Sequence, residues 1–128
     1  RRAPKLPAHR HSICFDDVSF HYDARHPVLD RVNLEIKFGE TLAIVGLTGC
    51  GKTSLINLIP RFHDPTQGTV RVDGYDLREL NLRSLRQQIG LVTQQTILFD
   101  DTIYNNIAYG AVHGTTREQV IAAAKEAY

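Results

Sequence analysis

One segment of the chain, residues 46–53, reads Gly-Leu-Thr-Gly-Cys-Gly-Lys-Thr. An apolar run at residues 41–45 precedes it, and a helix-forming run at residues 54–59 follows it. When a strand delivers such a loop and a helix begins at its lysine, successive backbone N–H groups converge on phosphate oxygens. Both flanks favour this interpretation over a glycine-rich turn with a solvated lysine. The segment therefore predicts a site for the phosphates of a nucleoside triphosphate.

The residue types inside this loop suit different parts of a metal-bound triphosphate. Gly49 and Gly51 allow phosphate oxygens to approach where a Cβ atom would clash. Lys52 offers an ammonium to the β- and γ-phosphates, and the Thr53 hydroxyl suits Mg²⁺, which prefers oxygen ligands. Ser54 is a candidate donor to the α-phosphate. The expected nucleotide contacts in the loop are Gly46, Leu47, Thr48, Gly49, Cys50, Gly51, Lys52, Thr53 and Ser54.

Cys50 is the one chemically unusual residue of the loop. It lies just before the expected helix and beside Lys52, an environment that favours the thiolate form. We hypothesise that alkylation of Cys50 blocks nucleotide binding; the alternative is a small side chain that only fills a loop position. With Cys14 as the second cysteine and Cys50 inside the loop, the sequence argues against a disulfide framework and for a reducing compartment.

Length and composition are those of one soluble globular domain. The chain has 128 residues, of which 42% are hydrophobic and 23% are charged. The net charge of +1 gives no general reason to expect nucleic acid as a partner. No apolar run approaches the ~18–20 residues that cross a bilayer, and no signal peptide is recognisable.

The first twelve residues differ in charge from the rest of the chain. No acidic residue occurs before Asp16. The segment holds the cations Arg1, Arg2, Lys5 and Arg10 together with Pro4 and Pro7. This composition predicts an extended linker over residues 1–12. Two alternatives remain for it: contact with an anionic membrane surface, at roughly 1 kcal/mol per cation, or a solvated arm.

Several short segments have the pattern of strands. Residues 13–22 and 32–36 alternate in polarity, the former with Val18, Phe20 and Tyr22 on one face. Residues 69–72 form a further strand that ends in a hairpin-type turn at Asp73-Gly74. The apolar run at residues 89–92, like that at 41–45, is typical of a buried strand in a parallel sheet.

Two helices follow from capping residues and apolar spacing. Asn81 is expected to cap a short helix that ends near Gln88, with an apolar stripe of Leu82, Leu85 and Ile89. The run Thr115-Thr116-Arg117-Glu118 is expected to form a capping box and to open a second helix. That helix carries Val120, Ile121 and Ala124, and its pattern still continues at Tyr128.

Two side chains outside the loop are candidates for the same nucleotide. Tyr22 ends a strand ahead of the loop, where an aromatic ring can stack on the base; plain packing is the alternative. Gln94 follows the run 89–92, where a neutral amide can reach Mg²⁺ or an attacking water without adding charge. Gln95 competes for that role, and a solvated loop glutamine is the other alternative.

A cluster of apolar residues lies just after Gln94, within residues 97–107. Apolar side chains in so short a segment suit a surface that meets another protein. Packing into the local core is the alternative.

Together these features resemble the nucleotide-binding domain of ATP-binding cassette transporters. The matching segments are Phe20-x-Tyr22, the loop 46–53 (Walker A), residues 59–65, residues 72–77, Leu91-Val92-x-Gln94 (the Q-loop), Leu98-Phe99 and Thr102-Ile103. The ending at residues 106–110 is similar to the exporter branch, near the bacterial lipid A exporter group. The resemblance covers residues 13–128, and residues 1–12 would be the linker from a preceding membrane domain.

The resemblance implies an α/β fold: a P-loop NTPase core with a partial parallel sheet, an antiparallel β-subdomain and the start of a helical subdomain. It implies that Tyr22 stacks on adenine, that Lys52 and Thr53 bind the phosphates and Mg²⁺ of ATP, and that Gln94 senses the γ-phosphate and joins Thr53 at the metal. Thr93 departs from the proline that exporters often carry, which loosens the loop but leaves Gln94 in register.

The resemblance also implies partners and a location. A second nucleotide-binding domain would bind head to tail, and residues 97–107 would receive coupling helices of a membrane domain. The domain would lie at the cytoplasmic face of a plasma or inner membrane. We therefore expect the ATP-binding part of an exporter ATPase, which couples ATP binding and hydrolysis to transmembrane transport.

The family's signature motif, its Walker B strand with the glutamate base and its switch histidine are expected beyond Tyr128. The resemblance therefore implies no catalytic residue within residues 13–128, and the chain alone is expected to bind MgATP weakly and hydrolyse it negligibly. Sheet edges left open by the lack of neighbouring strands would favour aggregation.

Two other function classes remain as alternatives. One is a soluble phosphate-loop enzyme such as a nucleotide kinase, which should carry a lid and acceptor-site arginines instead of an aromatic strand before the loop. The other is a binding-only regulatory module with a degenerate catalytic site. An intact aspartate–glutamate pair after residue 128 would distinguish a catalytic domain from such a module.

Overall fold

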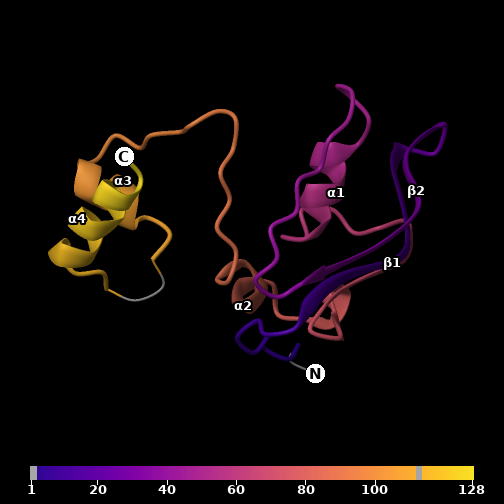
Figure 1. Cartoon of the computed structure of the whole chain (residues 1–128), viewed down its shortest axis with the longest axis horizontal. Helices are drawn as coiled ribbons and strands as arrows, with labels where there is room; N and C mark the ends of the chain where they lie inside the picture. Colours follow the sequence, from indigo (N-terminus) through magenta and orange to yellow (C-terminus); the bar gives the residue numbers. More distant parts are fainter. Residues whose placement is uncertain (1–2, 112–113) are drawn as a thin grey trace. The chain divides into compact units, whose positions relative to one another are not determined.

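The computed structural model describes residues 3–111 and 114–128, and the chain divides into two compact units, residues 1–89 and 90–128 (Figure 1). The first unit is built on an antiparallel four-stranded sheet in the order β2-β1-β3-β4. Its strands are β1 (Ser12–Asp23), β2 (His26–Lys37), β3 (Gln67–Val72) and β4 (Tyr75–Asp76). Its helices are α1 (Lys52–Leu58), η1 (Leu77–Glu79) and α2 (Leu82–Arg86). This sheet confirms the antiparallel β-subdomain expected from the sequence.

A bulge interrupts the pairing of β1 with β3. The register shifts between Asp16 and Ser19, and Gly68 of β3 lies opposite the shift with a φ of +76°. A Cβ atom on Gly68 would collide with the carbonyl oxygens of Asp16 and Asp17. Only glycine combines this close approach with a left-handed backbone, so the bulge depends on it.

The predicted turn at Asp73-Gly74 is confirmed. It joins β3 to β4 through the pair Val72 and Tyr75, and both turn residues have positive φ, 51° at Asp73 and 83° at Gly74. Two left-handed residues in succession define the type I′ turn, which matches the twist of the flanking strands.

The core of the first unit combines side chains from the sheet with others from α1, η1, α2 and the N-terminal arm. Its buried members are Leu6, Phe15, Val18, Phe20, Leu29, Leu55, Leu58, Val70, Val72, Leu77, Leu80 and Leu85. Val18 and Phe20 are buried as their alternation predicts. Tyr22, which the same alternation places on this face, remains 61% exposed.

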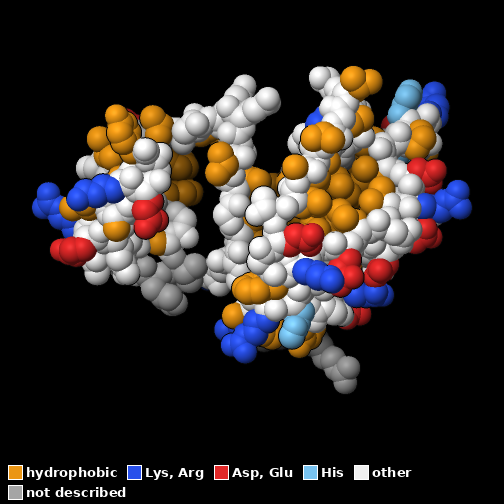
Figure 2. All heavy atoms as spheres, in the orientation of Figure 1, with side chains coloured by type: hydrophobic (Ala, Val, Ile, Leu, Met, Phe, Trp, Pro, Cys, Tyr) orange, Lys and Arg blue, Asp and Glu red, His pale blue; other side chains and the backbone are white. Residues whose placement is uncertain are grey.

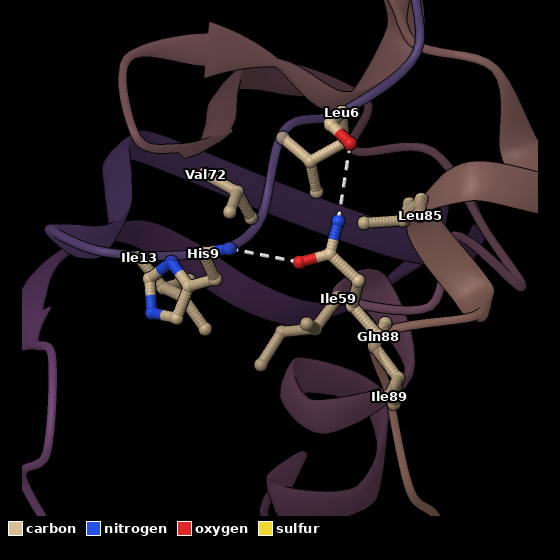
Figure 3. A pocket seen from close by; sticks show the side chains of 8 residues that line it. All are labelled: Leu6, His9, Ile13, Ile59, Val72, Leu85, Gln88 and Ile89. Carbon is tan, nitrogen blue, oxygen red and sulfur yellow. Dashed lines mark hydrogen bonds between the residues drawn. The ribbon is translucent and has the colours of Figure 1, made fainter.

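The N-terminal arm, residues 3–11, lies against the first unit, which argues against the alternative of a solvated arm. The backbone N–H of Leu6 donates to Ser84 Oγ at 3.0 Å. The amide nitrogen of Gln88 donates to the carbonyl of Leu6, and its oxygen accepts from the N–H of His9 (Figure 3). The same nitrogen also donates to the carbonyl of Pro7. Arm and fold together line a small apolar pocket formed by Leu6, His9, Ile13, Ile59, Val72, Leu85, Gln88 and Ile89.

Asp73 anchors the arm where it enters β1. Its carboxylate accepts hydrogen bonds at 2.8–3.0 Å from three successive backbone N–H groups, those of Arg10, His11 and Ser12. Nδ1 of His9 lies 2.8 Å from the same carboxylate. Burial alone would raise the pKa of Asp73, but the backbone donors and His9 outweigh it and lower that pKa below its ordinary value.

Two runs that the sequence predicts as parallel strands, residues 41–45 and 89–92, form no strand in the described structure. Val45 is 87% exposed and Val92 is 98% exposed, so neither run is enclosed. A strand of a parallel sheet needs hydrogen-bonded neighbours and layers that cover its faces. Within residues 3–111 and 114–128 the strands that do form are antiparallel, so these two strand predictions are wrong here.

The predicted helix after Asn81 is α2, and its cap is confirmed. The side-chain oxygen of Asn81 accepts from the N–H of Ser84 at 3.1 Å. The helix ends at Arg86 rather than near Gln88. Of its expected apolar stripe, Leu85 is buried and Leu82 is 39% exposed.

The second unit contains α3 (Ile103–Ala108) and α4 (Arg117–Glu126). The capping box of α4 lies one residue later than predicted, at Thr116 and Gln119, whose side chains each accept from the other's backbone N–H. Val120 is buried, whereas Ile121 of the same predicted stripe is 46% exposed.

Candidate phosphate and base site

The loop 46–53 leads into α1, which begins at Lys52 as predicted. Gly51 caps the helix with a left-handed φ of 93°. A Cβ atom at Gly51 would lie 2.9 Å from the carbonyl oxygen of Val28 in β2. The loop therefore packs directly against β2, and the glycine allows both this approach and the backbone turn.

Lys52 folds back over its own loop. Nζ donates to the carbonyl oxygens of Gly46 and Leu47, both at 2.7 Å, and lies 3.6 Å from Cys50 Sγ. The ammonium is thus held among loop backbone groups and does not extend into solvent. A phosphate oxygen, which is a charged acceptor, would compete well against two neutral carbonyls for this donor.

The two hydroxyls that follow Lys52 have different environments. Thr53 is exposed, and its hydroxyl makes no hydrogen bond to any residue that the structure describes. Ser54 is 7% exposed, and its Oγ lies 3.1 Å from the hydroxyl of Tyr22. Thr53 is therefore free to bind a metal ion, whereas Ser54 connects the loop to β1.

Tyr22 stands in a small aromatic cluster. Its ring is perpendicular to that of Phe20, at 4.8 Å between centroids, and to that of His63, at 5.2 Å. His63 in turn lies 5.5 Å from Phe20. Tyr22 thus packs on its neighbours and still exposes most of its surface, which suits a ring that receives a planar ligand.

The sequence prediction placed Tyr22 and Ser54 at one site, and the structure brings them together. It missed His63, one of the six histidines of the chain. His63 lies in the irregular segment after α1, and no periodicity connects it with β1. The one signal in the sequence that could have indicated a role for His63 was its imidazole ring, within the segment from Arg61 to Asp64.

Gln94 belongs to the other unit. Residues 91–100 have neither helix nor strand, and Gln94 is exposed. Its neighbour Gln95 accepts a hydrogen bond at its backbone carbonyl from the Thr93 hydroxyl, at 2.7 Å. Because residues 1–89 and 90–128 are separate units, the joining of Gln94 and Thr53 at one metal remains a prediction.

Residues 97–107 present apolar side chains at the surface of the second unit. Ile97, Leu98 and Ile103 are 78%, 76% and 80% exposed, and α3 contains no buried residue. Figure 2 shows apolar side chains gathered on the part of this unit toward the top of the view. The exposure favours an interaction surface over packing into a local core.

Asn106 fixes the shape of this segment. Its side chain accepts from the N–H of Phe99 at 2.8 Å and donates to the carbonyl of Phe99 at 3.1 Å. The ring of Phe99 lies 4.3 Å from that of Tyr109. A hydrogen bond from Asn105 lowers the pKa of Asp101, which precedes the Thr102 cap of α3. The exposed apolar residues are therefore displayed on an ordered segment.

Among the residues that the structure describes, none of the helices has the length and apolar character needed to span a membrane.

Comparison with known proteins identifies the family. Residues 29–127 match the model of the family described as ABC transporter. The chain is 52% identical over 125 residues to the ATP-dependent lipid A-core flippase of Syntrophus aciditrophicus, covering 98% of this chain and 20% of that protein. It is also 52% identical over 126 residues to the protein of the same name from Desulfotalea psychrophila, covering 98% of this chain and 22% of the relative.

A solved structure agrees with these relatives. The structure of a bacterial Atm1-family ABC exporter with ATP bound has a TM-score of 0.92 and 43% identity, over 98% of this chain and 22% of that one. The chain thus spans about a fifth of the length of the proteins it matches. On the family match and these similarities, the chain belongs to the ATP-binding cassette transporter family and is part of its nucleotide-binding domain.

Proposed function

We propose that this chain forms the base and phosphate site of an exporter ATPase, which uses ATP to drive transport across a membrane. The single observation that carries the proposal is the contact between the hydroxyls of Tyr22 and Ser54, at 3.1 Å. Ser54 follows Lys52 and Thr53 in the first turn of α1. An exposed aromatic ring and a phosphate loop are thereby held side by side, as a nucleotide with a planar base and an anionic chain requires.

In this proposal each residue has one role. Tyr22 stacks on adenine, Lys52 exchanges its two carbonyl partners for phosphate oxygens, and the buried Ser54 hydroxyl faces the α-phosphate. The residues of the loop 46–53 supply backbone N–H groups to the same phosphates.

The donor set also fits Mg²⁺. The Thr53 hydroxyl and the side-chain oxygen of Gln94 are hard oxygen ligands, and Mg²⁺ commonly combines few protein ligands with phosphate oxygens and water. The ion would neutralise charge on the phosphate chain. Gln94 would sense the γ-phosphate through this shared ion.

The partners follow from surfaces that the chain exposes. We propose that residues 97–107 receive the coupling helices of a membrane domain, because Ile97, Leu98 and Ile103 are exposed on an ordered segment.

A second nucleotide-binding domain would close over the phosphate loop head to tail. Residues 1–12 would link the domain to its membrane part, and the domain would lie at the cytoplasmic face of that membrane. The relatives are named as ATP-dependent flippases, and this chain would supply the ATP-dependent step of such transport.

The metal role gives the sharpest test of the site. Thr53→Ala should weaken binding of ATP in the presence of Mg²⁺ by roughly 10- to 100-fold, since a charged-partner interaction is worth about 1.5–3 kcal/mol. In EDTA the variant and the unchanged protein should bind ATP equally, as measured by titration calorimetry. Thr41→Ala, at an exposed threonine before the loop, is the matched control. Equal losses with and without Mg²⁺ would remove Thr53 from the metal site.

A further inference from the structure

One neighbour of the Tyr22 ring comes from outside both β1 and the phosphate loop. His63 is exposed in the segment after α1, and its ring stands perpendicular to that of Tyr22 with 5.2 Å between centroids. The same ring lies 5.5 Å from Phe20 at an interplanar angle of 38°. Phe20 and His63 together therefore form two sides of the space that the Tyr22 ring occupies.

The backbone around Tyr22 does little to fix that ring. The pairing of β1 with β2 shifts register between Phe20 and His21 and again between His21 and Asp23. The pairing of β1 with β3 has already ended at Ser19. The pairing with β2 continues to Asp23 and His26 but is irregular around Tyr22, so the orientation of the ring depends mainly on its side-chain contacts: the hydroxyl on Ser54, Phe20 and His63.

The segment that carries His63 is itself held firmly on both sides. Before it, the guanidinium of Arg61 makes two hydrogen bonds to the Asp64 carboxylate, at 2.6 and 3.1 Å, and a further one to the carbonyl of Leu77. After it, the N–H and the hydroxyl of Thr66 both donate to the carbonyl of Ser19 in β1, at 2.9 Å. The position of His63 relative to β1 is therefore set by contacts that do not involve Tyr22.

From these contacts we infer that His63 is a positioning residue for the base subsite: it holds the Tyr22 ring ready to stack on the planar base of a nucleotide. The inference rests on the proposed function, which makes Tyr22 the stacking residue. Without the His63 ring, Tyr22 keeps its hydroxyl contact with Ser54 but gains rotational freedom about it. A nucleotide must then order the ring as it binds, at the cost of an immobilised side chain.

The test separates the base from the phosphates. In the full-length protein, dissociation constants are measured by calorimetry for MgATP and for Mg²⁺ tripolyphosphate, which lacks base and sugar. His63→Ala should weaken MgATP binding roughly two- to tenfold and leave tripolyphosphate binding unchanged. His63→Phe keeps a ring against Tyr22 and should restore most of the MgATP affinity.

Two further variants complete the design. His11→Ala removes an exposed histidine at the opposite end of β1 and should change neither ligand. Tyr22→Ala should weaken MgATP alone, and adding His63→Ala to it should produce no further loss, because His63 acts only through Tyr22.

Each contrary result has a distinct meaning. If Tyr22→Ala weakens MgATP binding but His63→Ala does not, stacking stands and the positioning role is wrong. If His63→Ala weakens both ligands equally, the residue supports the fold and not the base subsite, and the inference is overturned. If Tyr22→Ala itself leaves MgATP affinity unchanged, the base-stacking part of the proposed function fails and the role of His63 fails with it.

Discussion

Gln88 and His9 are 79 positions apart in the chain, yet the backbone N–H of His9 donates to Gln88 Oε1 at 2.8 Å. The same side chain donates to the carbonyls of Leu6 and Pro7, at 3.2 and 2.8 Å. One amide thus bonds to the arm at three points.

Gln88→Ala should loosen the arm. Loss of three hydrogen bonds at a partly exposed position should lower the free energy of unfolding by about 1–2 kcal/mol, measured by urea denaturation. The amide of His9 should also exchange its hydrogen faster, because its acceptor is gone. Gln87→Ala is the matched control: Gln87 is an exposed neighbour in the same turn, and its substitution should stay within about 0.5 kcal/mol. Equal stability and equal exchange in the two variants would contradict the anchoring role.

Asp73 should make arm docking sensitive to acid. Its pKa is lowered in the folded state by the N–H groups of the arm in spite of burial, so the carboxylate stabilises the fold at pH values above its unfolded pKa of about 4. That contribution is lost as the pH falls through the lower folded pKa. Urea denaturation should give a smaller free energy of unfolding at pH 3 than at pH 7. In Asp73→Asn this difference between the two pH values should be smaller.

Asn is the appropriate replacement because Asp73 has a φ of 51°, a left-handed conformation that Asn tolerates well. The variant should therefore keep the type I′ turn and lose the charge together with one of the two acceptor oxygens that the arm uses. If Asp73→Asn shows the same acid dependence as the unchanged protein, other carboxylates cause it. Asp64 is the first to examine, because a side-chain hydrogen bond from Arg61 lowers its pKa as well.

Lys52→Ala should abolish tight binding of ATP. Its Nζ already sits over the loop on the carbonyls of Gly46 and Leu47, so phosphate binding needs only an exchange of acceptors. Loss of a charged donor to phosphate should cost about 1.5–3 kcal/mol of binding free energy, which raises the dissociation constant roughly 10- to 100-fold. Lys125→Ala, in the last turn of α4, is the control. An unchanged ATP affinity in Lys52→Ala would exclude the loop as the phosphate site.

Local signals account for what the sequence predicted correctly. The start of α1 at Lys52, the Asp73-Gly74 turn and the Asn81 cap each depend on a few consecutive residues whose backbone preferences agree. Such preferences are strong because they act over one turn of chain. The capping box of α4 shows the limit of this precision: two adjacent threonines offer the same motif, and Thr116 rather than Thr115 forms it.

Features that depend on distant parts of the chain were not predictable in this way. The arm bonds to Gln88, and His63 meets Tyr22, only because the sheet brings them together. The runs at 41–45 and 89–92 have the composition of buried strands, but a strand also needs partners, and the pattern contains no information about whether they are present. Gln94 shares this limit, since its role at a metal depends on residues far along the chain.

Alkylation of Cys50 should block the phosphate site. The thiol is exposed, lies 3.6 Å from Lys52 Nζ, and a Cβ atom at Gly46 would come within 2.7 Å of its sulfur. A maleimide adduct at this position would therefore occupy the space between the ammonium and the loop. We expect loss of MgATP binding by tenfold or more after complete modification, and slower modification when MgATP is already bound.

The two cysteines of the chain allow a matched comparison. Cys50→Ser should bind MgATP and resist the reagent. Cys14→Ser should remain sensitive, because it retains the exposed Cys50, whereas Cys14 is half-buried in β1 beside Ser12. The readout is MgATP affinity against the fraction of thiol modified. Complete modification of Cys50 with full ATP affinity would instead support the simpler role, in which a small side chain fills the space beside Gly46. That outcome would also mean that the phosphates bind farther along the loop, toward Thr53, than the position of the Lys52 ammonium indicates.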